Sequence, residues 1–128
     1  MDSSGGLEAP LLKRRVSEED FIWFKVAAIS GMLAVGLGAY GTHMFKPTNP
    51  TNKDVWQTAS LYHLVHTVAL LAAPLTKRPR VFGGLLTFGL VAFSGSCYIA
   101  ALYENRSLSL PAPFGGFGFI GAWASLLF

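Results

Sequence analysis

Charged side chains in this sequence are confined to short clusters that separate four long uncharged windows. The windows cover residues 26–45, 55–76, 81–103 and 107–128, which gives lengths of 20, 22, 23 and 22 residues. A helix that crosses the hydrocarbon core of a bilayer needs about 20 predominantly apolar residues. The spacing therefore predicts an all-α fold, an integral membrane four-helix bundle made of two helical hairpins.

The composition argues against a soluble protein and against several classes of function. Hydrophobic residues make up 52% of the chain and charged residues 13%, whereas a soluble domain carries about 25% charged residues. A chain of 128 residues is too short to bury four helices that are apolar all round. No Lys/Arg stripe with interleaved aromatic residues is present, so nucleic acid is not an expected partner. Cys97 is the only cysteine, which excludes an internal disulfide.

The boundaries of the helices follow from capping residues and prolines. Acidic residues after Ser17 predict that the first helix starts near Glu18, and it should end before Pro47. Asp54 is the expected N-cap of the second helix, and Pro74 its end. Because of their proline and glycines, residues 113–116 are expected to form a strained or partly unwound first turn of the last helix.

These signals divide the chain into two parts. Residues 1–17 are predicted to be a flexible cytoplasmic tail. Residues 18–128 are predicted to form the transmembrane domain, with spans at about 23–45, 55–75, 81–103 and 110–128.

Basic residues predict the orientation in the membrane. Seven lie on one side of the expected topology and three on the other. Since basic residues concentrate on the cytoplasmic side, both termini are expected in the cytoplasm. The larger set is Lys13, Arg14, Arg15, Lys25, Lys77, Arg78 and Arg80, and the smaller set is Lys46, Lys53 and Arg106.

Small residues recur four positions apart along the predicted spans, as at Ser30, Ala34 and Gly38. Such rows allow close approach of helices in lipid. They are typical of packing inside one bundle, and the alternative is a surface for a homo-oligomer or a membrane-protein partner.

Several short motifs resemble those of one family when they are taken in order. They are GAYGTH at residues 38–43, ASLYHLVHT at 59–67, FSG at 93–95 with Tyr98, APFGG at 112–116 and GAW at 121–123. The chain, over about residues 27–128, is similar to the transmembrane protein 256 family, which includes the bacterial YgdD-type proteins and carries a domain of unknown function. It departs from that pattern in its longer charged tail and in Thr42, where the family usually has Ala.

The resemblance implies a small four-helix integral membrane protein. It implies no reaction, substrate or cofactor.

The candidate functional site is a group of polar residues and glycines expected in one leaflet. Ionisable groups at membrane depth face the bundle interior or a water-filled cavity and are functional candidates. Amides of an unwound first turn would add a place for an anion or a carbonyl oxygen. The group is either a ligand or proton site, or a set of packing residues that satisfy one another. Its members are His43, Ser60, His63, His66, Tyr98, Gly115 and Gly116.

Catalysis, metal binding and cofactor binding are not predicted. His63 and His66 have the i, i+3 spacing of metal ligands, but a structural zinc site needs four ligands and the uncharged windows contain no carboxylate. The same lack of Asp and Glu leaves no group to orient a catalytic imidazole. The sequence therefore predicts a structural or accessory membrane protein, associated with the lipid bilayer and with a partner or a second copy. The alternative is a small transporter or proton-linked carrier that uses His63 and His66.

Two further motifs concern cellular handling. Glu8, Leu11 and Leu12 have the spacing of an acidic dileucine signal for endosomal or vacuolar sorting. Asn105 begins a glycosylation sequon that the expected topology places on the outer side. The sequence does not identify the membrane.

Overall fold

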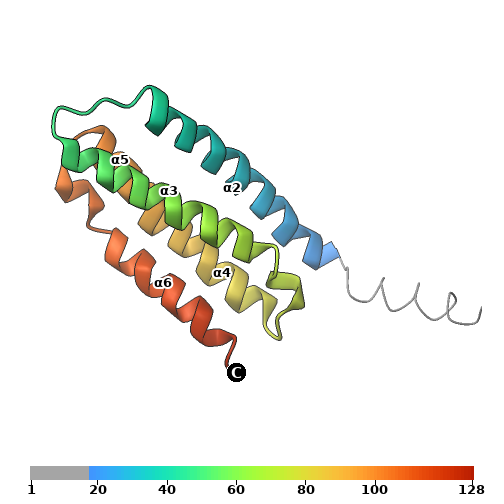
Figure 1. Cartoon of the computed structure of the whole chain (residues 1–128). Helices are drawn as coiled ribbons and strands as arrows, with labels where there is room; N and C mark the ends of the chain where they lie inside the picture. Colours follow the sequence, from blue (N-terminus) through green and yellow to red (C-terminus); the bar gives the residue numbers. More distant parts are fainter. Residues whose placement is uncertain (1–17) are drawn as a thin grey trace, which may run out of the picture.

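The computed structural model describes residues 18–128, and this part of the chain is helical, with no strand. The tail at 1–17, with its dileucine motif, lies outside the described residues. The helices run as antiparallel rods (Figure 1). They are α2 (Glu18–His43), α3 (Pro50–Leu70), the continuous series α4 (Pro79–Gly89), η2 (Leu90–Gly95) and α5 (Ser96–Leu102), and α6 (Ala112–Ser125), with 3-10 turns η1 (Ala73–Leu75) and η3 (Arg106–Ser109).

The first helix follows the sequence prediction, and the second begins earlier than predicted. α2 begins at Glu18 and ends at His43, ahead of Pro47. The N-cap of α3 is Asn49 rather than Asp54, so the prediction for Asp54 is wrong. The Asn49 side chain accepts a hydrogen bond from the amide of Thr51 at 3.0 Å. Pro50 follows at the first helical position, where the missing amide hydrogen costs nothing.

The third rod contains a turn of π-helix at its middle, η2, between two α-helical segments. A π turn leaves carbonyl groups that the regular α-helical pattern would have satisfied. Ser96 lies just after η2, and its hydroxyl donates to the carbonyls of Ala92 and Phe93. The rod is therefore unbroken from Pro79 to Leu102.

The last helix corrects a second prediction. Pro113 and Gly115 lie in regular α-helix, because α6 begins at Ala112. The amide of Gly115 donates to the carbonyl of Pro111 at 3.1 Å. Proline is tolerated in the first turn of a helix, so residues 113–116 need not unwind.

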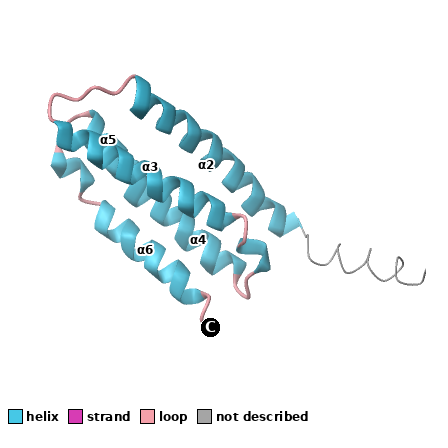
Figure 2. Ribbon diagram, viewed as in Figure 1, coloured by secondary structure: helices cyan, strands magenta, loops and turns pink. Residues whose placement is uncertain are grey.

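α3 and the α4–η2–α5 rod lie between α2 on one side and α6 on the other (Figure 2). α3 and α6 both pack against the α4–η2–α5 rod, whereas α2 packs mainly on α3 and touches α4 only slightly. Of the apolar stretch of α2, 11% is buried, against 50% of the stretch from Pro79 to Leu102. Among the described helices, these two are long and apolar enough to cross a membrane.

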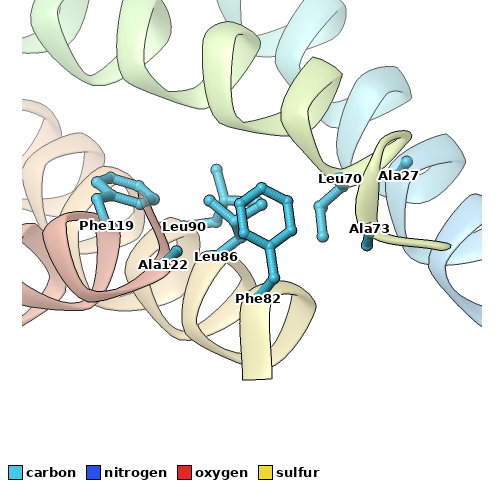
Figure 3. Close-up of a cluster of buried hydrophobic side chains, with 8 residues drawn as sticks. All are labelled: Ala27, Leu70, Ala73, Phe82, Leu86, Leu90, Phe119 and Ala122. Carbon is cyan, nitrogen blue, oxygen red and sulfur yellow. The ribbon is translucent and has the colours of Figure 1, made fainter. Parts of the chain in front are cut away.

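Two hydrophobic clusters hold the rods together, one toward each end. Figure 3 shows the first, in which side chains from α2, α3, α4 and α6 meet around Phe82, Leu86 and Phe119. The second surrounds Trp56 and Tyr98. Glycines allow the close approaches: a Cβ at Gly41 would lie 2.3 Å from the Trp56 ring, and the Trp56 indole donates to the carbonyl of Leu37 at 2.9 Å.

A carboxylate joins two turns at the end of the molecule where α2 finishes. Glu104 accepts hydrogen bonds from the backbone amide of Asn49 at 3.0 Å and from the Asn52 side chain at 3.2 Å. The Asn49 amide, with the other hydrogen-bond donors, holds the pKa of the exposed Glu104 carboxyl below its ordinary value. The backbone of Glu104 is left-handed, with φ of 50°. This uncommon conformation for a residue with a side chain ends α5 and turns the carboxylate toward the 44–49 turn.

Candidate functional site

In the middle of α3, between residues 61 and 68, the polar side chains face the interior and large apolar side chains face outward. His63, His66 and Thr67 are buried, with 6–8% of their surface exposed. The exposed residues in the same stretch are Leu61, Leu64, Val65 and Val68. A soluble helix shows the opposite distribution. The α3 sequence therefore places its imidazoles where other helices meet it.

His63 lies at the centre of a continuous chain of hydrogen bonds, the His63 network. Its Nδ1 atom lies 3.0 Å from the Tyr98 hydroxyl, which lies 3.3 Å from Ser60 Oγ. Its Nε2 atom lies 3.1 Å from Ser30 Oγ, which lies 2.6 Å from Thr67 Oγ1. The network thereby connects α2, α3 and α5.

The His63 network can be ordered in two directions. Every hydroxyl both donates and accepts, and a neutral imidazole carries its hydrogen on one nitrogen only. If Nε2 carries the hydrogen, it donates to Ser30, and Tyr98 donates to Nδ1. If Nδ1 carries it, both bonds reverse. The neutral ring satisfies its two neighbours in either state.

His66 has one fixed arrangement. Its Nδ1 atom lies 2.8 Å from the Tyr62 carbonyl oxygen, which can only accept a hydrogen bond. The Trp123 indole, which can only donate, gives its hydrogen to Nε2 at 3.1 Å. Nδ1 therefore carries the single ring hydrogen. The ring also stacks on Phe119, with centroids 3.7 Å apart and planes inclined by 12°. His66 thus joins α3 to α6 as a neutral group.

The structure brings together some of the predicted site residues and separates the others. Ser60, His63 and Tyr98 share one network, whereas His66 faces α6. His43 is exposed at the end of α2, away from that network. Gly115 is a packing position, because a Cβ there would lie 2.3 Å from the backbone nitrogen of Phe93.

The predicted anion site at residues 114–116 is not formed in the way expected. The amide of Gly115 is hydrogen-bonded to the carbonyl of Pro111, the N-cap of α6. Gly116 is not tightly packed, since the nearest atom to a Cβ there would be 3.9 Å away. The prediction of an anion site was based on an unwound first turn at residues 113–116, and that turn is helical.

Sequence reasoning missed two partners of the histidines. Ser30 was visible only as one of a row of small residues, and Trp123 only as part of a motif in the last helix. Neither is adjacent to a histidine in sequence, so no local pattern pairs them. Polar residues at helix-packing intervals are the signal from which Ser30 could have been found.

The buried polar side chains of the described residues are hydrogen-bonded. Between Glu18 and Phe128, no group of three His, Cys, Asp or Glu side chains is placed to hold a metal ion. Every buried side-chain nitrogen or oxygen in that part has a hydrogen-bond partner. Cys97 is a buried free thiol. The exposed Asn105 accepts hydrogen bonds from Ser107, and its glycosylation stays a prediction.

Comparison with known proteins identifies relatives over most of the chain. The chain is 35% identical to a UPF0382 membrane protein of Staphylococcus saprophyticus, over 83% of this chain and 93% of that protein. It is 36% identical to the UPF0382 inner membrane protein YgdD of Escherichia coli, over 79% and 82% of the two chains. It is also 36% identical to the UPF0382 membrane protein YwdK of Bacillus subtilis, over 83% and 93%. No solved structure matches the chain.

A family model agrees with these relatives and with the motifs in the sequence. The model described as "Protein of unknown function (DUF423)" matches residues 37–116, which hold both His63 and His66. The chain therefore belongs to the DUF423 family, and its relatives include the UPF0382 membrane protein YgdD.

Proposed function

We propose that this protein spans a membrane four times, through α2, α3, the α4–η2–α5 rod and α6. The observation that carries the proposal is the distribution over residues 61–68 of α3, where the imidazoles face inward and the leucines and valines face outward. α2 also exposes large apolar residues, among them Ile29, Met32, Leu33 and Val35. Exposed apolar side chains on these helices fit a hydrocarbon surrounding, and the relatives named as membrane proteins support this.

The length of each rod can be compared with the thickness of the hydrocarbon core of the bilayer. The 26 residues of α2 and the 21 of α3 correspond to about 39 Å and 32 Å at 1.5 Å per residue. The 14 residues of α6 reach only about 21 Å, less than the ~30 Å hydrocarbon core. The last span therefore uses the flanking residues between about 110 and 128, with local thinning of the bilayer.

The proposed orientation puts both termini in the cytoplasm. Arg78 and Arg80 lie near Asp20 at the start of α2, where these residues line one small pocket. Lys46, Lys53 and Arg106 are in or near the turns at the other end. The basic residues thus favour the first end as cytoplasmic. Reporter tags at each terminus and within residues 46–53 test this, and a 46–53 tag on the same side as the termini would refute it.

We further propose a structural or accessory role, within an assembly that contains a membrane-protein partner or a second copy, and no enzymatic activity. Support comes from the complete hydrogen bonding of the buried polar groups and from the largely exposed α2. Isolation in a mild detergent, followed by mass spectrometry of the intact particle, is the test. A monomer without co-purifying protein would contradict the accessory role.

A proton-linked carrier is the second candidate, and the His63 network favours it. When the network changes direction, the donor and acceptor roles reverse at each hydrogen bond from Ser60 through His63 to Thr67. Proton relays in membranes use ionisable side chains such as histidine. Gln can donate and accept but does not titrate. His63→Gln should abolish ion-coupled uptake into vesicles if the chain is a carrier. In an accessory protein, His63→Gln should leave assembly unchanged.

A further inference from the structure

A long groove lies between α2 and the α4–η2–α5 rod, and Ser30, His63 and Tyr98 of the His63 network form its floor. Its volume is about 830 Å³, within the roughly 300–1,000 Å³ of typical ligand sites. It follows α2 from Val26 to Leu37, which is about 16 Å at 1.5 Å per residue. The groove exists because α2 packs on α3 and hardly touches α4.

The walls of the groove are apolar and uncharged. Its apolar lining includes Ile29 and Leu33 of α2, Val91 of η2 and Ile99 of α5. Among the described residues, no Asp, Glu, Lys or Arg lines it. A charged occupant would lose its hydration without compensation. The occupant that fits is neutral and mainly hydrocarbon.

The polar groups of the lining offer hydrogen-bond acceptors and no free donor. Ser94 donates its hydrogen to the Ala59 carbonyl, Thr87 to Gly83, and Ser96 to the carbonyls of η2. The hydrogens of Ser30 and Tyr98 go to other members of the His63 network in both of its directions. Each hydroxyl oxygen has two acceptor sites, so Ser30 keeps an unused lone pair in either case.

We propose that this groove binds a neutral lipid whose polar group is a hydroxyl, with the hydrocarbon chain along α2 and the hydroxyl donating to the floor at Ser30. A hydroxyl supplies the donor that the lining lacks. An ester or ketone carbonyl, which can only accept, finds no donor there. The inference rests on the proposed membrane location, and it adds a ligand class to it.

The test uses the full chain reconstituted in phosphatidylcholine vesicles with a photoreactive probe, hexadecanol that carries a diazirine in its chain. Labelling should map to the groove-lining positions of α2 and α5, and unlabelled hexadecanol should compete for it. Methyl palmitate, an ester of similar length without a hydroxyl, should not compete. Equal competition by the two compounds would overturn the proposal, as would labelling that neither reduces.

Substitutions on α2 provide a matched pair. Leu33→Trp places a large ring in the groove and should lower the competable labelling about tenfold, the lower end of what misfit in an apolar pocket costs. Met32→Trp is the control, since Met32 is on the same helix and 70% exposed but is not part of the lining. Ile29→Trp is a second groove-filling variant in case Leu33→Trp does not fold. Equal labelling of the filled and control variants would refute the site.

Two other outcomes are kept separate. Extraction with alkaline carbonate first shows whether each variant is integrated in the membrane, so failure of the membrane proposal is seen independently of labelling. If two copies of the chain can be crosslinked to each other at groove-lining positions without the lipid probe, a second chain fills the groove. That result would overturn the lipid assignment.

Discussion

Replacing Gly115 with alanine tests the packing of α6 against η2. The added Cβ would lie 2.3 Å from the Phe93 nitrogen and 2.9 Å from the Ala92 carbonyl carbon. Both are main-chain atoms that cannot rotate aside, and ordinary contact begins near 3.4 Å. The two helices must therefore separate by about 1 Å, which places the cost at the upper part of the ~1–3 kcal/mol range for overpacking.

Gly116→Ala is the matched control. It lies in the same helix, and the nearest atom to its Cβ, at 3.9 Å, belongs to the Phe93 side chain. Both substitutions gain up to about 1 kcal/mol of helix propensity, so this term cancels between them. The control should be about 3 kcal/mol more stable than Gly115→Ala.

Thermal unfolding in detergent measures the difference. At roughly 4 °C per kcal/mol for a chain of this size, the two melting temperatures should differ by about 12 °C. Equal melting temperatures, or a Gly115→Ala protein as stable as the wild type, would refute the close contact between α6 and η2.

Three further predictions concern the polar contacts. His63→Gln should leave the melting temperature near that of the wild type. His63→Leu should lower stability by about 1–3 kcal/mol, because two buried hydroxyls lose their partner. Thermal unfolding in detergent measures both. Trp123→Phe should lower stability by about 1 kcal/mol, since it leaves Nε2 of His66 without a donor. In a double-mutant cycle, His66→Phe should then destabilise the Trp123→Phe protein less than it destabilises the wild type. The pKa of Glu104 is lowered in the folded chain, so its contact with Asn49 should persist at neutral pH and weaken as pH falls through that lowered pKa. In a pH titration followed by NMR, the chemical shift of the Asn49 amide should change in the wild type and stay constant in Glu104→Gln.

The helical nature of the described chain could be predicted from charge spacing alone. Uncharged windows mark the four rods because a charge at depth in an apolar environment is costly, whatever its neighbours are. The capping of α3 shows where this reasoning stops. Asp54 and Asn49 are both good N-caps, and the choice of Asn49 depends on Pro50 and on the Glu104 carboxylate that receives the Asn49 amide. That contact joins residues 55 positions apart, beyond any local pattern.

The candidate site was only partly predictable, for a related reason. Helical periodicity places Ser60, His63 and Thr67 on one face, and they do lie together. Which helix meets His66 is a matter of packing, and it depends on glycines that let α6 approach. The prediction for residues 113–116 was wrong because it used helix propensity at positions where packing against η2 decides the conformation.

The π turn in the third rod acts as a change of register. A π turn contains one more residue than an α-helical turn. The side chains after it are therefore rotated by about 100° around the helix axis, relative to a regular helix. Gly89, before the turn, faces α6 through Phe119, while Tyr98, after it, faces α3. In a regular helix these two residues, nine positions apart, would point in opposite directions at about 100° per residue. Deleting one residue within η2 would carry Tyr98 away from His63, so the length of this segment is expected to be held constant even where its side chains vary.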